Sequence, residues 1–382
     1  MSDQHLHIIS FTIPYPPNYG GAIDIFFKIK ALYLAGVKVH LHCFSYDRNP
    51  APELEQYCHE VYYYPRKTGL RSALTWKPYI VYSRRSDQLL SNLLKDEYPI
   101  LFEGLHSCYY LTNTALKNRI RIYRESNIEH LYYYHLFKAE SNLLKKLFYI
   151  LSSLKLRAFQ STLSHASMMF TVSSEDHEYL SRKFPTTQVE YLPSFHKDDE
   201  VKSLSGMGDF ALYQGNLSVA ENKKAAEYLI KEVFRDSGIH FIIAGMNPSR
   251  SLVRLADKIS NITLIANPTD QTMSQLISSA QVNILVTFQP TGLKLKLLNA
   301  LFNGRFCLVN PGMIFGTELG DLCEIGTNNS ELRQKVTELM RQTFDEQRLS
   351  QRKEKLLQYH SNKENCIRLL NLLSLFSRRR KF

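Results

Sequence analysis

Short apolar segments alternate with helix-forming segments along nearly the whole chain, and this alternation limits the folds available to it. Helix-forming stretches, beginning with residues 22–34, separate most of the apolar runs in the first half. Those runs lie at residues 5–13, 37–44, 60–64, 100–102, 120–123, 168–172 and 189–192. Strands that alternate with helices form parallel sheets covered on both faces, built from right-handed crossovers. The first half therefore predicts a doubly wound, Rossmann-like α/β domain.

A polar stretch at residues 193–209, acidic in its middle and rich in serine and glycine, interrupts the alternation. The pattern then restarts, with strands at 210–214, 239–244, 262–265 and 282–287 and helices at 222–233, near 252 and at 272–279. The predicted organisation is an N-terminal domain (1–195), a linker (196–209), a second doubly wound domain (210–350) and a basic helical tail (351–382). Ligands of such sheets bind at the carboxyl ends of the strands, so a cleft between the two domains is expected.

Charge and cysteine content narrow the class of protein. The formal net charge of +11 favours anionic partners, namely nucleic acid, acidic lipid head groups or phosphorylated small molecules. No zinc-finger spacing or RNA-binding aromatic signature is present, which argues against nucleic acid. The cysteines are far apart and form no metal-ligand spacing, as is typical of reduced thiols in a cytosolic protein. They are Cys43, Cys58, Cys108, Cys307, Cys323 and Cys366.

The N-terminus lacks the pattern of a signal peptide, and no apolar run approaches the length of a membrane-spanning helix. We therefore expect a cytoplasmic protein, and any contact with the inner face of the plasma membrane would be peripheral.

The segment 282–310 contains the pattern most suggestive of a binding site. The apolar run VNILVTF is followed by QPTGLKLKLLNALFNG and then by a second apolar run, RFCLVN. Gly292 permits a tight turn, and the helix after it would present free backbone N–H groups and its positive dipole end. Lys294 and Lys296 add positive charge there. This combination favours a phosphate or diphosphate, although an ordinary helix start with two solvated lysines is the alternative.

Five segments in order resemble the retaining glycosyltransferases of the GT-B fold, specifically family 4 and its bacterial group 1 relatives. They are PYPPNYGGAI after the first strand, YRESNIEHLYYYHLFKAE in the middle, LYQGNLSVAENKKAAEYLI at the start of the second domain, FIIAGMNPS, and PTGLKLKLLNALFNG. The resemblance covers nearly the whole chain. It implies two doubly wound domains facing across a cleft, with a sugar nucleotide held mostly by the C-terminal domain.

The resemblance also implies roles for individual residues in donor binding. Gly20 and Gly21 would form an N-terminal loop that closes on donor and acceptor. The residues expected near the donor phosphates are Gly215, Asn216, Lys224, Gly292, Lys294 and Lys296. No metal ion and no cofactor beyond the nucleotide-diphosphate sugar is expected, because the lysines and the helix dipole already neutralise the leaving diphosphate.

The sequence departs from the family pattern in two places. Family members usually carry two glutamates at the positions of Thr291 and Asn299. The amide oxygen of Asn299 can still accept hydrogen bonds from ribose hydroxyls, although it carries no charge. The family segment R-x-H-N-x-E appears at residues 124–129 with Ser126 in place of the histidine. These departures leave a second interpretation open, in which the chain is a catalytically impaired nucleotide-sugar or glycan-binding relative.

Candidate catalytic residues follow predicted strands of the first domain. Glu103 and His106 lie just beyond the apolar run at 100–102, where a parallel strand delivers side chains to a ligand. Either could orient an acceptor hydroxyl, whereas a salt bridge for Glu103 and a helix cap for His106 are the structural alternatives. Ser126 and Glu129 complete the candidate set. The resemblance implies front-face displacement, in which the leaving diphosphate accepts the proton of the acceptor.

The segment 142–163 has apolar side chains near one helical face and basic side chains elsewhere. The apolar set is Leu143, Leu144, Leu147, Phe148, Leu151 and Leu154. Such a segment is either a basic amphipathic helix on an anionic membrane or a core helix with a solvated basic face.

Together these features predict a retaining glycosyltransferase that moves a sugar from a nucleotide-diphosphate sugar to a glycan or lipid-linked acceptor. Bacterial surface polysaccharide or lipopolysaccharide biosynthesis is the expected setting. The sequence has no G-x-x-x-x-G-K-[ST] segment, which argues against a kinase or NTPase.

Overall fold

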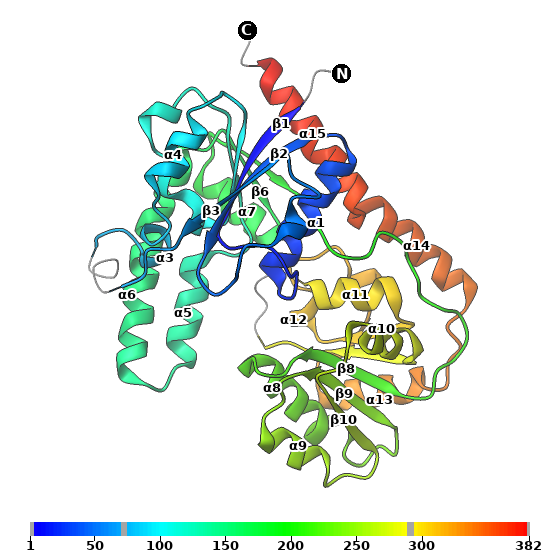
Figure 1. The fold of residues 1–382 in the computed structure, drawn as a ribbon. Helices are drawn as coiled ribbons and strands as arrows, with labels where there is room; N and C mark the ends of the chain where they lie inside the picture. The colour runs from blue at the N-terminus through cyan, green and yellow to red at the C-terminus, as the bar shows by residue number, and fades with distance from the viewer. Residues whose placement is uncertain (1–3, 70–74, 289–293, 380–382) are drawn as a thin grey trace. The chain divides into compact units, whose positions relative to one another are not determined.

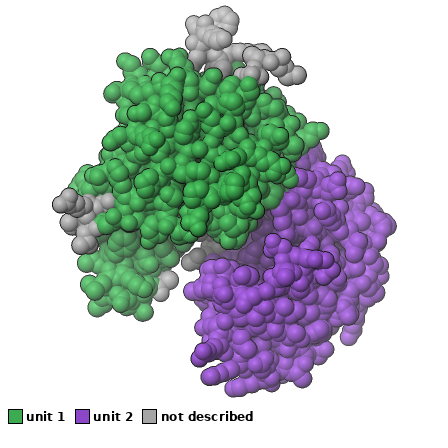
Figure 2. Space-filling model, viewed as in Figure 1, with its two compact units in different colours: residues 1–196, 362–382 green, residues 197–361 purple. Residues whose placement is uncertain are grey.

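The computed structural model describes residues 4–69, 75–288 and 294–379. The chain forms two compact units, which Figure 2 shows in different colours. Unit 1 comprises Met1–His196 and Asn362–Phe382, and unit 2 comprises Lys197–Ser361. The sequence places a linker at 196–209 and a separate tail from residue 351, whereas in the structure residues 197–361 belong to one unit and residues 362–382 to the other.

Unit 1 is built on a seven-stranded parallel sheet in the order β3-β2-β1-β4-β5-β6-β7. Its strands are β1 (His5–Ser10), β2 (Lys38–Ser45), β3 (Glu60–Pro65), β4 (Ile100–Glu103), β5 (Arg121–Arg124), β6 (Met168–Thr171) and β7 (Gln188–Tyr191). Its α-helices are α1 (Gly20–Leu34), α3 (Tyr79–Tyr82), α4 (Asp87–Leu93), α5 (Glu129–Ala139), α6 (Leu143–Phe159), α7 (Ser174–Lys183) and α15 (Asn362–Arg379). The 3-10 turns are η1 (Pro52–Leu54), η2 (Leu105–Tyr110), η3 (Thr114–Leu116) and η4 (Gln160–His165).

Unit 2 repeats this plan with a six-stranded parallel sheet in the order β10-β9-β8-β11-β12-β13. Its strands are β8 (Ala211–Asn216), β9 (Phe241–Met246), β10 (Ile262–Ala266), β11 (Val282–Leu285), β12 (Phe306–Val309) and β13 (Glu324–Ile325). Its helices are α8 (Ala220–Tyr228), η5 (Leu229–Phe234), α9 (Arg250–Ala256), α10 (Asp270–Ser279), α11 (Leu295–Asn303), α12 (Pro311–Ile314), η6 (Gly320–Leu322), α13 (Asn329–Leu339) and α14 (Glu346–His360). The two doubly wound domains predicted from the sequence are confirmed.

The same topological feature recurs in both sheets. In unit 1 the chain runs outward from β1 to β3 and then returns to place β4 on the other side of β1. In unit 2, β8 and β11 are the corresponding neighbours. Such a reversal of strand order leaves a crevice at the carboxyl ends of the two neighbouring strands, because the following connections leave in opposite directions. Any ligand site is therefore expected beyond β1 and β4, and beyond β8 and β11.

α15 belongs to unit 1 although unit 2 precedes it in the chain. It lies beside α1 (Figure 1), and the Cys366 thiol donates to the carbonyl of Ala31 over 3.5 Å. Cys366, Leu369 and Leu373 are buried in the same apolar core as β1 and β2. An amphipathic helix is stabilised by burying its apolar face, so this packing explains why the final segment does not form a separate tail.

A chain of hydrogen bonds between histidines crosses β1 and β2 inside unit 1. His7 Nε2 lies 3.0 Å from Asp96 Oδ1, and His7 Nδ1 lies 2.9 Å from His42 Nε2. His42 Nδ1 lies 2.8 Å from the hydroxyl of Tyr64, which accepts from Asn92. One assignment satisfies every group: both imidazoles carry the proton on Nε2, and the Tyr64 hydroxyl donates to His42. The network therefore requires both histidines to be neutral.

We expect the stability of unit 1 to fall in mild acid because of this network. Burial lowers the pKa of His7 to about 4, against the opposing hydrogen bond and charge of Asp96, and burial also lowers the pKa of His42. The unfolded chain therefore binds more protons than the folded chain between pH 6.5 and about 4. Stability is lost as the pH falls through this range, by about 2 kcal/mol for His7 at pH 5.

The free energy of unfolding between pH 7.5 and 5, from denaturant titrations of wild type and His7→Gln, tests this expectation. Glutamine keeps one donor and one acceptor but does not titrate, so the variant should show a shallower pH dependence. His165→Gln, at an exposed position, is the matched control and should follow the wild type. A His7→Gln profile parallel to that of the wild type contradicts the assignment.

Candidate functional site

The first candidate site lies where β1 and β4 end in unit 1. Gly104 directly follows β4 and has φ +67°, a left-handed conformation that glycine adopts without strain. A Cβ atom at Gly104 would lie 3.4 Å from His106 Nδ1, 3.6 Å from the Phe11 ring and 3.7 Å from Ser126 Oγ. These are ordinary contact distances, so glycine is needed here for the left-handed turn and not for space, and the loops after β1, β4 and β5 meet at this turn.

Three of the four predicted catalytic residues come together here. His106 lies in η2, and its Nδ1 atom is 3.7 Å from Oε1 of Glu129, the first residue of α5. Ser126 faces the same point beside Gly104. His106 Nδ1 is buried without a hydrogen-bond partner among the described residues, so the alternative of a helix cap does not apply. An unpartnered buried nitrogen is costly in a protein that binds nothing there.

Burial sets the protonation of this pair. It raises the pKa of Glu129 to about 8, although the charge of Arg84 opposes the shift. It lowers the pKa of His106 well below the ordinary value, and the charges of Arg84 and Arg66 act in the same direction. At neutral pH the pair therefore consists of a carboxylic acid that can donate and an imidazole nitrogen that can accept. A hydroxyl placed between them would be held by both groups.

Arg84 fixes the loop that follows β1. Its side chain is buried and donates to the carbonyls of Phe11 over 2.7 Å and Ile80 over 2.6 Å. The charge of Arg84 therefore stays close to Glu129. The described residues show no direct ion pair between these two side chains. Sequence reasoning missed Arg84, because its segment carries no motif and its role depends on contacts across the sheet.

Glu103, the fourth candidate, points into the unit instead. Its carboxylate accepts from Lys28 over 2.7 Å, and Lys28 also donates to Asp24 over 2.9 Å. Arg124 donates to Asp24 over 3.0 Å and to the carbonyl of Leu192 over 3.0 Å. These four charged side chains are buried. The salt bridge left open by the sequence is the arrangement found, because Glu103 compensates a buried lysine.

Gly20 and Gly21 form the first turn of α1, beyond the end of β1. The N-cap residue Tyr19 makes no side-chain capping bond, and the first turn has no acidic residue. A Cβ atom at Gly21 would lie 2.6 Å from the ring of Phe11. Gly21 thus lets the start of α1 approach Phe11, whose ring contacts His106. The two glycines lie in a helix and not in the predicted loop. Whether they contact a ligand stays a prediction.

The second candidate site lies where β8 and β11 end in unit 2. Lys296, in the first turn of α11, donates to Oδ1 of Asn222 over 2.8 Å, and Asn222 donates to the carbonyl of Asn216 over 2.9 Å. A Cβ atom at Gly215 would lie 3.4 Å from the side chain of Asn222. Burial lowers the pKa of Lys296, and the charge of Glu221 opposes this. The predicted residues Gly215, Asn216 and Lys296 are therefore brought together.

Two further contacts complete this site. Lys224 in α8 lies over the ring of Phe288, with Nζ 4.5 Å from the ring centre. Thr287, just beyond β11, donates a hydrogen bond to Glu221. Lys294 is the N-cap residue of α11. Lysines and the starts of two helices thus gather at the strand ends, where backbone N–H groups and positive charge favour an anion.

Asn222 and Glu221 were missed by sequence reasoning. Both lie in the segment AENKKAAEY, where no local pattern marks them, and the start of α8 places their side chains within hydrogen-bond distance of Thr287 and Lys296. The predicted residues Thr291 and Gly292 lie outside the described residues. Asn299 is described, and its Oδ1 atom accepts from Asn303 over 2.9 Å. A carbonyl oxygen has a second lone pair, so it can still accept from a ribose hydroxyl.

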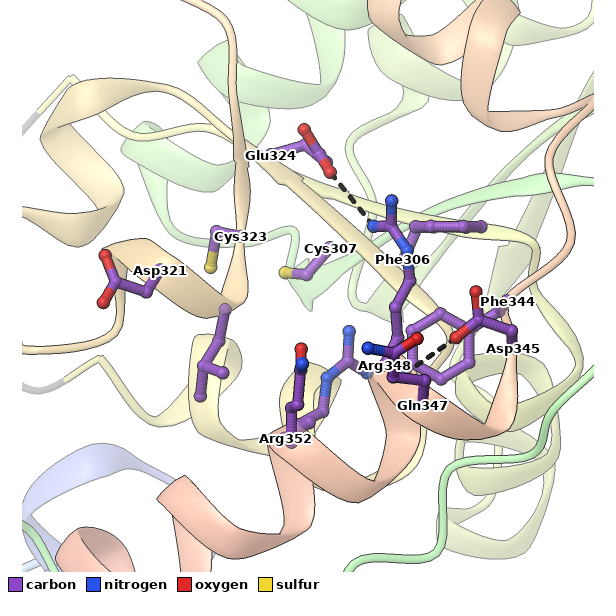
Figure 3. A pocket seen from close by; sticks show the side chains of 12 residues that line it. Phe306, Cys307, Asp321, Cys323, Glu324, Phe344, Asp345, Gln347, Arg348 and Arg352 are labelled. Atoms are coloured by element: carbon purple, nitrogen blue, oxygen red, sulfur yellow. Dashed lines mark hydrogen bonds and ion pairs between the residues drawn. The ribbon is translucent and has the colours of Figure 1, made fainter.

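A pocket of about 400 Å³ lies elsewhere in unit 2, at the amino ends of β12 and β13 (Figure 3). Cys307 and Cys323 point toward each other in it, and Arg352 and the pair Arg348–Glu324, 3.4 Å apart, lie beside them. It contains none of the predicted site residues. All six cysteines are unpaired thiols, as the sequence predicted.

Two features are missing from the described part of the chain. None of its helices is both long and apolar enough to cross a bilayer. No group of three or more histidine, cysteine, aspartate or glutamate side chains in residues 4–69, 75–288 and 294–379 is arranged to hold a metal ion.

Comparisons with known proteins place this geometry in context. No protein-family model matches the chain. A Klebsiella pneumoniae protein named "Uncharacterized 44.6 kDa protein in cps region" is 26% identical over 346 residues, which cover 85% of each chain. Among solved structures, TarM has a TM-score of 0.64 at 10% identity, covering 97% of this chain and 98% of its own.

Two other solved structures cover similar shares. HepE from Anabaena, in complex with UDP and glucose, has a TM-score of 0.63 at 11% identity, covering 97% of this chain and 99% of its own. The UDP-forming α,α-trehalose-phosphate synthase of Burkholderia xenovorans, in complex with glucose-6-phosphate, has a TM-score of 0.61 at 9% identity, with 98% and 100% covered. These structures are GT-B glycosyltransferases, and the likeness extends over both sheets. The chain therefore has the two-domain GT-B fold.

Proposed function

We propose that the protein is a glycosyltransferase that moves a sugar from a nucleotide-diphosphate sugar to a glycan or lipid-linked acceptor, with retention at the anomeric carbon. The observation that carries this proposal is the cluster around Lys296 at the ends of β8 and β11. There a half-buried lysine and the start of α11 favour a diphosphate. The fold supports it, and so do similar structures whose names or ligands include UDP.

In this proposal unit 2 binds the donor. Lys294, Lys296 and the backbone N–H groups that begin α11 hold the diphosphate, and Lys224 and the loop at Gly215 and Asn216 contribute to the phosphate site. Asn299 accepts from the ribose. The same lysines stabilise the diphosphate as it leaves, so the proposal requires no metal ion.

Unit 1 supplies the acceptor side. The His106 nitrogen accepts from the acceptor hydroxyl, and the protonated Glu129 donates to its oxygen, which orients a lone pair toward the anomeric carbon. As the new glycosidic bond forms on the same face and the bond from the anomeric carbon to the diphosphate breaks, the hydroxyl hydrogen passes from its hydrogen bond with His106 to the leaving diphosphate oxygen. Ser126 lies beside both groups but is not needed for the proton transfer, so its replacement of a histidine is compatible with activity.

The setting we propose is surface polysaccharide biosynthesis on the cytoplasmic side of the membrane. The relative from the cps region of Klebsiella pneumoniae supports this choice. A binding protein without transferase activity is the second candidate. The side chain of Asn303 already occupies one lone pair of Asn299 Oδ1. This favours the second candidate, because a weaker contact with the ribose lowers the affinity for the donor.

Calorimetric titration with UDP, GDP, ADP and their common sugars tests the donor site. We expect one nucleotide to bind and to raise the melting temperature, because the ligand binds only the folded state. Lys296→Met should weaken that binding by about 10- to 100-fold, the usual loss for a charged hydrogen bond.

Lys223→Met is the matched control, since Lys223 lies on α8 and makes a partly exposed ion pair with Glu227 over 3.7 Å. It should bind as the wild type does. Unchanged affinity in Lys296→Met refutes the phosphate site. Nucleotide-sugar binding without transfer to any acceptor supports the second candidate.

A further inference from the structure

α5 and α6 form an antiparallel hairpin that extends from unit 1 (Figure 1). Its attachment uses one side of α6: Leu156 is buried in the core of the unit, and the hydroxyl of the buried Ser153 donates to the carbonyl of His130 over 2.7 Å. On the other side of the helix, at an angular position between Leu144 and Phe148, Lys155 donates to the carbonyl of Thr75 over 2.8 Å. The rest of the helix surface is therefore presented outside the core.

The outward surface of α6 is apolar. We name it the leucine face, and it consists of Leu143, Leu144, Leu147, Phe148, Leu151 and Leu154, all exposed. Leu143 and Leu144 are each 80% exposed. At 100° per residue these side chains occupy one side of the helix, opposite the side that carries Ser153 and Leu156. The sequence left open whether this face is core or surface, and the structure shows it exposed.

Exposed apolar side chains continue on α5, where Leu131, Tyr132 and Tyr134 are also exposed. Single exposed apolar residues are common, but the six that share one side of α6 mark an interaction surface. Tyrosine beside leucine is typical of the boundary between lipid and water, because the ring is apolar and the hydroxyl is polar.

Positive charge surrounds this surface. Between residues 130 and 159 the chain has five basic side chains, lysine or arginine, and one carboxylate, Glu140. Lys138, Lys145 and Arg157 are exposed. Lys138 lies over the ring of Tyr134, with Nζ 4.7 Å from its centre, so cation and aromatic ring sit together. The basic flank complements an anionic surface and repels a second copy of the same hairpin.

From these observations we infer that the leucine face, with its basic flank, docks the protein on an anionic lipid bilayer. The leucines enter the boundary between head groups and acyl chains, while the lysines contact the acidic head groups. Because α5 begins at Glu129, the docked hairpin connects directly to the acceptor-side pair of Glu129 and His106. A lipid-linked acceptor follows from this placement, and that last step alone rests on the proposed function.

Sedimentation of the full-length protein with vesicles, without nucleotide or acceptor, tests the docking independently of transferase activity. We expect binding to vesicles of equimolar phosphatidylcholine and phosphatidylglycerol, and binding at least about tenfold weaker to phosphatidylcholine alone. Replacing both Leu143 and Leu144 by serine should weaken binding at least about tenfold. Replacing Lys138 and Lys145 by glutamine should weaken it about tenfold on the anionic vesicles only.

Leu34→Ser is the matched control, since Leu34 is 72% exposed at the end of α1. It should bind vesicles as the wild type does, and circular dichroism should show all variants folded. Absence of vesicle binding, or binding indifferent to the leucine substitutions, overturns the proposal. Light scattering provides a second outcome that overturns the proposal. If the wild type does not bind vesicles but is a dimer, and the leucine substitutions convert it to a monomer, then the leucine face pairs two copies of the chain.

Discussion

The Asp24→Asn protein is expected to lose about 3–5 kcal/mol of stability in unit 1, because the change leaves buried cations without their counter-charge. Asp24 accepts hydrogen bonds from Lys28, from Arg124 and, over 2.7 Å, from the backbone N–H of Phe195. Burial acts to raise the pKa of Asp24, but Arg124 and Lys28 outweigh it and hold the pKa well below its usual range. Asparagine removes the charge and turns an amide group toward donors.

Hydrogen–deuterium exchange of peptides from α1 and β4 measures this loss, because it reports on unit 1 separately from unit 2. Glu178→Gln is the control: it breaks an ion pair with Arg182 at 3.3 Å in which both side chains are exposed, and it should change stability by less than about 0.5 kcal/mol. If the exchange protection of Asp24→Asn corresponds to a stability within about 0.5 kcal/mol of the wild type, the network of buried charges does not stabilise unit 1.

The Glu129→Gln protein is expected to be more stable than the wild type at pH 7, by about 3 kcal/mol. The folded pKa of about 8 lies above the ordinary value of 4.5. The energetic cost of Glu129 is therefore absent below pH 4.5 and grows as the pH rises toward 8. Glutamine resembles the protonated acid and avoids this cost. Denaturant titrations at pH 4.5 and pH 7 should show the gain only at the higher pH.

The same substitution separates two roles in the reaction. If Glu129 acts as a donor in its protonated form, Glu129→Gln retains transfer at pH 7 and loses the decline in rate that the wild type shows above about pH 8. Glu129→Ala, which has no donor, should lower the rate by about 100-fold. A pH–rate profile of the three proteins with one acceptor is the measurement.

Glu125→Gln provides the control for this profile. Glu125 is a buried carboxyl in the same loop, but it accepts from the Tyr123 hydroxyl over 2.7 Å and from the backbone of Asn127 over 3.1 Å. Its replacement should alter stability and leave the shape of the profile unchanged. A folded Glu129→Gln protein that is inactive at pH 7 shows that the ionised carboxylate is required, and the donor role is then wrong.

Local patterns were sufficient to predict the architecture. Each strand before β13 coincides with a predicted run. The inner strands are buried on both faces and need continuous apolar residues, whereas the edge strands β3, β7 and β10 are only partly buried. Boundaries were less accurate: α1 begins at Gly20, two residues before the predicted start, since glycine at a helix start costs little and its effect depends on Phe11. β13 has only two residues and gives no periodic signal.

The candidate sites were predictable only in part. Lys296 followed from the pattern of a glycine turn before a helix start, whereas Gly215 followed only from the resemblance to the family. The structure places both beside Asn222, and phosphate binding there stays a prediction. Glu103 could not be assigned, since its partner Lys28 is 75 residues away and no local pattern links them. The partners of His7 could not be predicted from local patterns either. The exposure of the leucine face could not be predicted, because amphipathic periodicity shows that a helix has two faces without showing which one is covered.

The position of α15 has a consequence for biosynthesis. Cys366 and Leu369 fill the same core as Leu6 and Ile8, so unit 1 requires a segment that the ribosome produces only after all of unit 2. Domains usually fold in the order of their synthesis. Here unit 2 can complete its core first, while unit 1 still exposes the apolar surface that α15 will cover. During translation the nascent chain therefore depends on protection of its first half, and a premature stop before residue 362 would leave that half without the helix that closes it.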